Sequence, residues 1–266
     1  MLIAHLSDCH IAAPGKKAYG VVATDAHLRA CVEHINGLRP RPDVALVTGD
    51  ITYSGSLNEA AHAREILGQL EMPFFLVPGN HDDRQTLWQV FAGGAIPERQ
   101  EEALSFVVDR FPIRLIGLDS TSPGNPGGEW SRDQDTWLRA VLDQAPERPS
   151  LLFFHHPPLK FGVLETDEDG FTGADRLGDT VAGYRNILAL ACGHIHLQAH
   201  ALWQGTVVST ALSMGLHLVL DLTLKEPSRF VPDVAGYQLH FISSENRLVS
   251  HSVMLGAEKS ACLFEE

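Results

Sequence analysis

Short motifs of histidine, aspartate and asparagine recur along the first three quarters of the chain. Such side chains bind metal ions through oxygen or imidazole nitrogen, and this donor set favours hard to borderline ions such as Mn, Fe, Co or Zn. The motifs are D-x-H (Asp8, His10), G-D (Asp50), G-N-H-D (Asn80, His81, Asp82), H-H-P-P (His155, His156) and G-H-x-H (His194, His196).

Each motif follows the end of a predicted strand, as in FFLVPGNHDD at residues 74–83. Ligands of open α/β sheets bind outside the carboxyl ends of the strands, so we expect these motifs to converge. A single metal ion cannot use so many ligands. Two ions about 3.5–4 Å apart can use them if one carboxylate bridges the pair, and such a pair can hold both oxygens of an in-line displacement at phosphorus.

The elements that position these motifs alternate between β-rich runs and helical patterns, which predicts a mainly parallel sheet with crossover helices. Helices are expected over residues 24–38 and 58–70, the second capped by Asn58, and a further helix begins at the capping-box pair Ser131 and Gln134. From about residue 205 the runs TVVSTAL, LHLVLDL, YQLHFI and RLVSHSVML predict antiparallel strands, and the stretch 226–233 is expected to project.

The chain has 266 residues, of which 44% are hydrophobic, and we expect one domain. Its 20 basic and 33 acidic residues give a net charge of −13, which disfavours nucleic-acid polymers and anionic membranes as partners. The four cysteines form no C-x-x-C pair, and we find no signal peptide and no membrane-spanning run. These features predict a cytoplasmic location.

The five motifs, in this order and spacing, resemble those of the calcineurin-like metallophosphoesterases, specifically the bacterial branch of cyclic-nucleotide and glycerophosphodiester phosphodiesterases. G-N-H-D is the strongest single motif, and all five in order are very specific. The similarity extends to SDCHIAAPGKKAYG near the start and to His217 in STALSMGLH. The resemblance implies an α/β fold, a four-layer αββα sandwich of two mixed β-sheets flanked by helices. It also implies that residues 1–266 form one metallophosphoesterase domain, in which residues from about 215 to 266 help to cap the site and build oligomers.

The resemblance also implies two metal ions per subunit, drawn from Fe, Mn, Zn and Co, and a metal-bridging hydroxide as nucleophile. The catalytic residues would be His81 and Asp50. His81 would stabilise charge on the phosphoryl group or protonate the leaving alkoxide, oriented by Asp82 or Asp83. The resemblance assigns one metal to Asp8, His10 and His196 and the other to Asn80, His155 and His194, with Asp50 bridging the two. It assigns substrate binding to Asn80, His81 and His217.

Several neighbouring residues are expected to be structural. His156 is left out of the metal set because the first histidine of H-H-P-P is the ligand in the family. Cys9 is expected to be a small spacer, Cys192 to pack in its strand, and Trp130 and Trp137 to pack in the core rather than stack on a base. The ending EKSACLFEE is interpreted as a frayed tail, with an oligomer contact as the alternative.

The expected function is hydrolysis of small phosphodiesters, either 3′,5′-cyclic nucleotides or glycerophosphodiesters. The expected partners are the small substrate and further copies of the chain. A phosphomonoesterase of the same superfamily is one alternative. The protein serine/threonine phosphatases are disfavoured because GDITYSG and GNHDD replace their D-R-G and G-N-H-E elements. A non-catalytic interaction scaffold is the other alternative, disfavoured because no expected ligand is missing.

Overall fold

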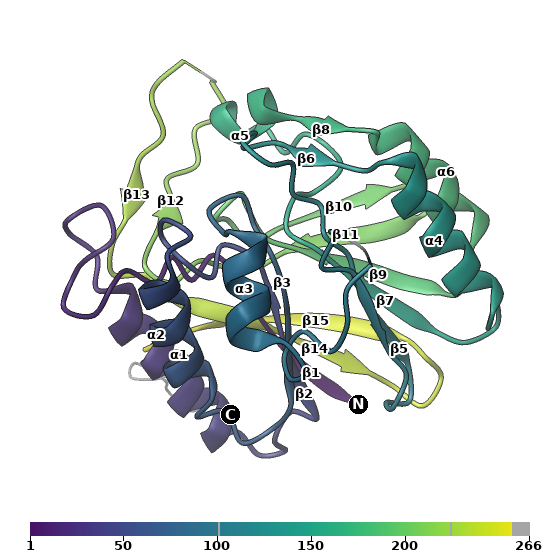
Figure 1. Ribbon diagram of the computed structural model, residues 1–266, viewed down its shortest axis with the longest axis horizontal. Helices are drawn as coiled ribbons and strands as arrows, with labels where there is room; N and C mark the ends of the chain where they lie inside the picture. Colours follow the sequence, from purple (N-terminus) through teal and green to yellow (C-terminus); the bar gives the residue numbers. More distant parts are fainter. Residues whose placement is uncertain (101, 224, 257–266) are drawn as a thin grey trace, which may run out of the picture.

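The computed structural model describes residues 1–100, 102–223 and 225–256. Two mixed β-sheets pack against each other, with α1, α2 and α3 over the first sheet and α4 and α6 over the second (Figure 1). The predicted four-layer α/β sandwich is therefore confirmed. The helices are α1 (Thr24–Gly37), α2 (Leu57–Leu67), α3 (Arg84–Phe91), α4 (Arg132–Asp143), α5 (Leu164–Asp169) and α6 (Ala174–Gly183).

The first sheet has the strand order β15-β14-β1-β2-β3 and the second β10-β11-β9-β7-β5-β4. The strands of the first are β1 (Leu2–Leu6), β2 (Val44–Thr48), β3 (Phe74–Val77), β14 (Gly236–Ile242) and β15 (Leu248–Met254). The strands of the second are β4 (Phe106–Val108), β5 (Arg114–Gly117), β7 (Ser150–Phe153), β9 (Ile187–Cys192), β10 (Ala199–Trp203) and β11 (Thr206–Thr210). Two short pairs join β6 (Gly128–Glu129) to β8 (Phe171–Thr172) and β12 (His217–Leu218) to β13 (Phe230–Val231).

The N-termini of α4 and α2 show which side chains cap these helices. α4 begins at Ser131 with the predicted capping box to Gln134. The prediction of Asn58 as the cap of α2 is wrong, because Ser56 accepts the Glu59 backbone N–H while the Glu59 carboxylate accepts the Ser56 N–H. This reciprocal pair satisfies two backbone donors at once, which a lone asparagine cap does not.

The C-terminal part is only partly antiparallel. β14 pairs antiparallel with both β1 and β15, as predicted, whereas β11 pairs antiparallel with β10 but parallel with β9. The predicted strand LHLVLDL ends at Leu218, beyond which Leu220 and Leu222 are exposed and so lack the burial that would favour an extended strand. Residues 216–223 and 225–231 form a projecting strap around β12 and β13 (Figure 1), which agrees with the expected excursion near 226–233. No helix among the described residues is long and apolar enough to cross a membrane.

A chain of hydrogen-bonded polar side chains is buried within the first sheet. His5 Nε2 lies 2.8 Å from Thr48 Oγ1, and His5 Nδ1 lies 3.1 Å from His240 Nε2. His240 Nδ1 in turn lies 2.8 Å from Ser250 Oγ on β15. His5, Thr48 and His240 are almost completely inaccessible to solvent. Buried polar groups need such partners, because an unpaired one costs the desolvation of the group.

Gln238 extends this polar layer to the second sheet. It lies opposite His5 in the β1–β14 pairing, donates its amide to the Thr210 carbonyl at 2.9 Å and accepts a hydrogen bond from Ser209 Oγ at 2.9 Å. The two sheets are thus joined by directional bonds as well as by apolar packing. The polar layer is defined here as His5, Thr48, Ser209, Gln238, His240 and Ser250.

The buried His5 should make the protein less stable in acid. Burial lowers the pKa of His5 from 6.5 to about 4, although a hydrogen bond to Gln238 partly opposes the shift. Between these values the unfolded chain binds the proton and the folded chain does not, so stability falls as pH falls. At about 1.4 kcal/mol per pKa unit, His5 should contribute a loss of about 2 kcal/mol between pH 7.5 and pH 5.

Urea unfolding of chelator-treated protein at the two pH values measures this loss. His5→Gln carries no titratable group at the position and should lose correspondingly less stability on acidification. An equal loss in both proteins would show that His5 does not titrate as described.

Candidate metal centre

The predicted ligands all lie just beyond the carboxyl ends of parallel strands. β1, β2 and β3 are neighbours in the first sheet, and β7 and β9 are neighbours in the second. Their carboxyl ends present the ligands to one place between the sheets. Asp8 and His10 follow β1, Asp50 follows β2, Asn80 follows β3, His155 follows β7, and His194 and His196 follow β9.

Four of these side chains form a first group. His10 Nε2 lies 3.0 Å from His196 Nε2 and 3.4 Å from Asp50 Oδ2. His196 Nε2 lies 3.5 Å from Asp8 Oδ1. Ligand atoms about 2.1 Å from one metal ion lie roughly 3.0–3.4 Å apart when the angle between them is 90–109°. The spacing of Asp8, His10, Asp50 and His196 therefore suits one coordinated cation.

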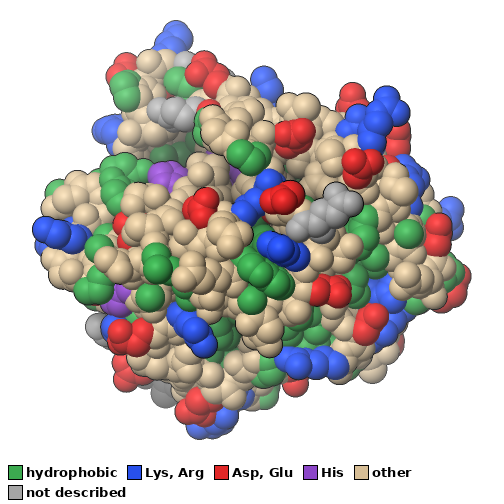
Figure 2. All heavy atoms as spheres, in the orientation of Figure 1, with side chains coloured by type: hydrophobic (Ala, Val, Ile, Leu, Met, Phe, Trp, Pro, Cys, Tyr) green, Lys and Arg blue, Asp and Glu red, His purple; other side chains and the backbone are tan. Residues whose placement is uncertain are grey.

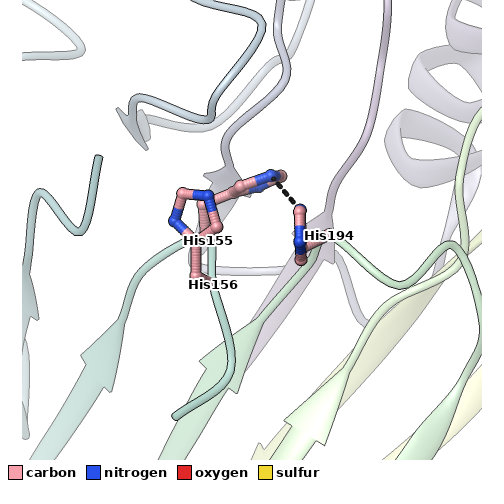
Figure 3. Close-up of side chains that lie close together, drawn as sticks. All are labelled: His155, His156 and His194. Atoms are coloured by element: carbon pink, nitrogen blue, oxygen red, sulfur yellow. Dashed lines mark hydrogen bonds between the residues drawn. The ribbon is translucent and has the colours of Figure 1, made fainter. Parts of the chain in front are cut away.

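A second group shares one oxygen atom with the first. Asn80 Oδ1 lies 3.0 Å from His155 Nε2 and 3.1 Å from His194 Nδ1. The His155 and His194 rings point toward one another, with these nitrogens 3.3 Å apart (Figure 3). Asp50 Oδ2 lies 3.5 Å from His155 Nε2, so the same oxygen borders both groups. This is the arrangement that a bridging carboxylate requires.

Two backbone carbonyls set the protonation of the ligand rings. His155 Nδ1 lies 2.7 Å from the Thr48 carbonyl, and His196 Nδ1 lies 2.9 Å from the Leu216 carbonyl. A carbonyl only accepts hydrogen bonds, so each Nδ1 carries the proton and each Nε2 directs a lone pair into its group. Converging lone pairs and carboxylate oxygens repel one another unless a cation lies between them. The residues present therefore fit a metal centre.

Burial also favours the ligating forms of the rings. It lowers the pKa of His10 and of His194 well below the ordinary histidine value, which keeps both rings neutral. Burial alone would raise the pKa of Asp50, but the neighbouring His155, His10 and His81 outweigh it and hold that pKa well below its usual range. Asp50 is accordingly an anion throughout the neutral range.

Most of the predicted ligands adopt a left-handed backbone conformation. φ is positive at Asp8 (51°), His10 (41°), Asp50 (48°), His194 (73°) and His196 (53°). Residues other than glycine are uncommon there, and such strain costs of order 1–3 kcal/mol per residue. The loops are therefore held in conformations that the chain alone does not favour, and these conformations aim the side chains at the shared centre.

Glycines let the ligand loops pack closely. A Cβ atom on Gly79 would lie 2.3 Å from both the backbone nitrogen and Oδ1 of Asp50. A Cβ atom on Gly193 would lie 1.9 Å from Ser7 Oγ and 2.9 Å from Asp8 Oδ2. The glycines of G-N-H-D and G-H-x-H are thus required by contact with the preceding ligand loops.

His81 lies beside the groups without belonging to either. Its backbone N–H donates to Asp50 Oδ1 at 2.9 Å, and its Nδ1 donates to the Tyr53 carbonyl at 2.9 Å. Burial opposes a charged ring, but Asp50 and the bond to Tyr53 outweigh it and raise the pKa of His81. The ring can therefore carry a proton on Nε2 near neutral pH, as a charge stabiliser or general acid must.

The prediction that Asp82 or Asp83 orients His81 is wrong. The Asp82 carboxylate instead accepts from the backbone of Ile51, Thr52 and Gly79, and so ties the two ligand loops together. Asp83 caps α3 by accepting the Thr86 N–H. The orienting acceptor is the Tyr53 carbonyl, which has no signature in the sequence because every residue carries one.

The structure supports the structural interpretation of several neighbouring residues. His156 lies near His155 and His194, but its Nδ1 is 2.9 Å from Ser120 Oγ and its Nε2 is 3.0 Å from the Pro126 carbonyl. Both nitrogens are engaged, so His156 offers no free lone pair. Cys9, Cys192 and Trp130 are buried in the core. Trp137 is partly buried and packs against the apolar core between the second sheet and helices α4 and α6.

A cavity of about 460 Å³ opens over the two groups. Its wall includes Tyr19, whose ring lies 5.6 Å from that of Phe230, and Arg229 on the strap. None of these three was predicted from the sequence as a site residue, because they reach the cavity from segments about two hundred positions apart. His217 lies in β12, and its buried Nδ1 has no hydrogen-bond partner in the described structure. It is absent from the described residues that line the cavity, so its substrate contact stays a prediction.

Comparison with known proteins identifies the class. The family model of calcineurin-like phosphoesterases matches residues 1–198. The chain belongs to this family, as its motifs predicted.

Relatives place it more closely within the family. A probable glycerophosphodiester phosphodiesterase, GpdQ, from Arcobacter nitrofigilis is 38% identical over 96% of this chain and 94% of the relative. The 3′,5′-cyclic adenosine monophosphate phosphodiesterase CpdA from Pseudomonas aeruginosa is 34% identical over 74% of this chain and 70% of the relative. A dimetal phosphatase from Danio rerio has the same fold, with a TM-score of 0.70, 15% identity and 95% of each chain covered.

Adding a methyl group at Gly193 should destroy the centre. Gly193→Ala places Cβ against Ser7 and Asp8 as described above, which should cost at least about 1–3 kcal/mol and displace the Asp8 loop. Metal content by mass spectrometry should fall well below that of the wild type. Gly37→Ala is the matched control, because a Cβ atom there meets nothing within 4 Å. Equal metal content in the two variants would contradict the packing argument.

Proposed function

We propose that the chain hydrolyses small phosphodiesters at a binuclear metal centre. The observation that carries the proposal is the position of Asp50 Oδ2, at 3.4 Å from His10 Nε2 and 3.5 Å from His155 Nε2. One metal ion would be held by Asp8, His10, Asp50 and His196, and the other by Asp50, Asn80, His155 and His194. The ions would be Fe, Mn, Zn or Co.

Bound metal ions supply a hydroxide near neutral pH and neutralise charge on the phosphoryl oxygens. The residues of this chain then divide the remaining work. Asp50 fixes the spacing of the two groups, and Asn80 presents its amide oxygen to one of them while its neighbour His81 faces the cavity. The proton on His81 Nε2 would stabilise the developing charge or pass to the leaving alkoxide.

The cavity supports a small diester as substrate. Its volume of about 460 Å³ is in the usual range for small-molecule sites, and Tyr19 and Phe230 offer aromatic surface to an ester arm. The net charge of −13 opposes a polyanion, and the face drawn in Figure 2 intersperses basic and acidic side chains without a continuous basic surface. The relatives named for glycerophosphodiesters and for cyclic AMP support the same reaction class.

A substrate panel on metal-reconstituted protein tests this function. Specificity constants should favour bis(p-nitrophenyl) phosphate and one natural diester, cyclic AMP or glycerophosphoethanolamine, over p-nitrophenyl phosphate. Preference for the monoester would instead indicate a phosphatase. Absence of turnover with both metal sites filled would indicate an interaction scaffold.

Substitution of His81 and Asp50 separates catalysis from metal binding. His81→Ala should retain both metal ions and lower kcat by about 100-fold or more, because it removes only the proton donor. Asp50→Ala should lose metal and nearly all activity. The exposed His200 provides a control variant, His200→Ala, that should behave as wild type. Normal turnover by metal-poor Asp50→Ala protein would rule out the mechanism.

We further propose a cytoplasmic homo-oligomer in which residues from about 215 to 266 take part. Cys9, Cys31 and Cys192 are free thiols, which suits a reducing compartment. Phe241, Val249 and Met254 expose apolar surface on β14 and β15, the latter an edge strand of the first sheet. The ending EKSACLFEE (residues 258–266) lies outside the described residues, so its contribution stays a prediction. Light scattering should give a mass of at least two chains of 29.1 kDa.

A further inference from the structure

We infer that His5 is a positioning residue for the ligand His155, acting through Thr48 across the buried polar layer. The inference rests on the proposed metal centre, and it adds a residue that contacts neither metal nor substrate. It concerns the group formed by Asp50, Asn80, His155 and His194.

The Thr48 carbonyl is the immediate link to the centre. It accepts the His155 Nδ1 proton at 2.7 Å and the Ser7 hydroxyl at 3.0 Å. Its position therefore sets the direction in which His155 Nε2 points. Partners of this kind orient metal-binding histidines, and their loss typically weakens metal affinity by about 10–100-fold.

The Thr48 carbonyl needs a separate anchor because Gly49 follows it. Gly49 has φ of 84°, and a Cβ atom there would lie 2.5 Å from His155 Nδ1. Glycine is thus required at this position, yet its free rotation leaves the orientation of the preceding peptide weakly determined. Besides the Ser7 hydroxyl, the Thr48 side chain supplies an anchor, because its Oγ1 lies 2.8 Å from His5 Nε2 and 3.5 Å from the Leu6 carbonyl.

His5 is in turn fixed from its other nitrogen. Nδ1 lies 3.1 Å from His240 Nε2, and His240 Nδ1 lies 2.8 Å from Ser250 Oγ. His5 is fully buried among polar partners, and Nδ1 also lies 3.3 Å from Gln238 Oε1. Of these partners, Thr48 is the one that leads to the metal centre.

Metal titration of chelator-stripped protein tests the inference. Thr48→Val keeps the shape and the carbonyl but removes the hydroxyl, and His5→Leu removes the imidazole. Each should weaken one of two Co²⁺ binding steps in calorimetry by about 10-fold or more, while the other step changes less than about threefold. The Co²⁺ absorption spectrum should change for the weakened site only.

Conservative variants separate positioning from general destabilisation. Thr48→Ser keeps the hydroxyl, and the His5→Gln amide can replace the Nε2 contact, so both should bind Co²⁺ within about threefold of wild type. Ser209→Ala is the matched control, because it removes a buried hydroxyl from the same polar layer without contacting Thr48. It should leave both binding steps unchanged.

The outcomes are distinct. Equal binding by Thr48→Val, Ser209→Ala and wild type would overturn the inference, as would parallel weakening of both steps in Thr48→Val and Ser209→Ala. If His5→Leu fails to fold, the near-isosteric Thr48→Val decides. Failure of the wild type itself to bind two ions would overturn the proposed centre rather than the role of His5.

Discussion

One oxygen of the Asp50 carboxylate, Oδ2, lies close to imidazole nitrogens from both sheets. It is 3.4 Å from His10 Nε2 and 3.5 Å from His155 Nε2. This contact ties β2 to β1 on one side and to β7 on the other. Neighbouring side-chain and backbone groups hold Asp50 in this position. The Asp82 carboxylate fixes the loops that carry Asp50 and Asn80, and the Asp50 Oδ1 atom receives the His81 N–H.

Such convergence has an energetic cost in the protein alone. The left-handed backbone at five ligands, the buried carboxylates and the facing imidazoles each oppose folding. Metal binding offsets these terms, because ions that bind only the folded state add their binding free energy to its stability. The apolar cores of the two halves and the polar layer between the sheets also offset these terms.

The sequence predicted which side chains would converge, because each follows an apolar run and a constrained turn, as Gly79 precedes Asn80 and Gly193 precedes His194. It predicted the layers because strand and helix patterns alternate. It could not predict the Tyr53 carbonyl as the partner of His81, since backbone acceptors leave no residue-specific trace. The cavity wall at Tyr19 and Phe230 was equally hidden, because only the tertiary fold brings these rings together.

The position of β14 has a consequence for how the chain can be divided. β14 pairs with β1 along its length, and the terminal amine of Met1 donates to the Ile242 carbonyl at 3.0 Å. The family match ends at residue 198, yet a fragment cut there would expose one whole edge of β1 and lose Gln238 and His240 from the polar layer. The catalytic motifs therefore do not delimit an autonomous folding unit.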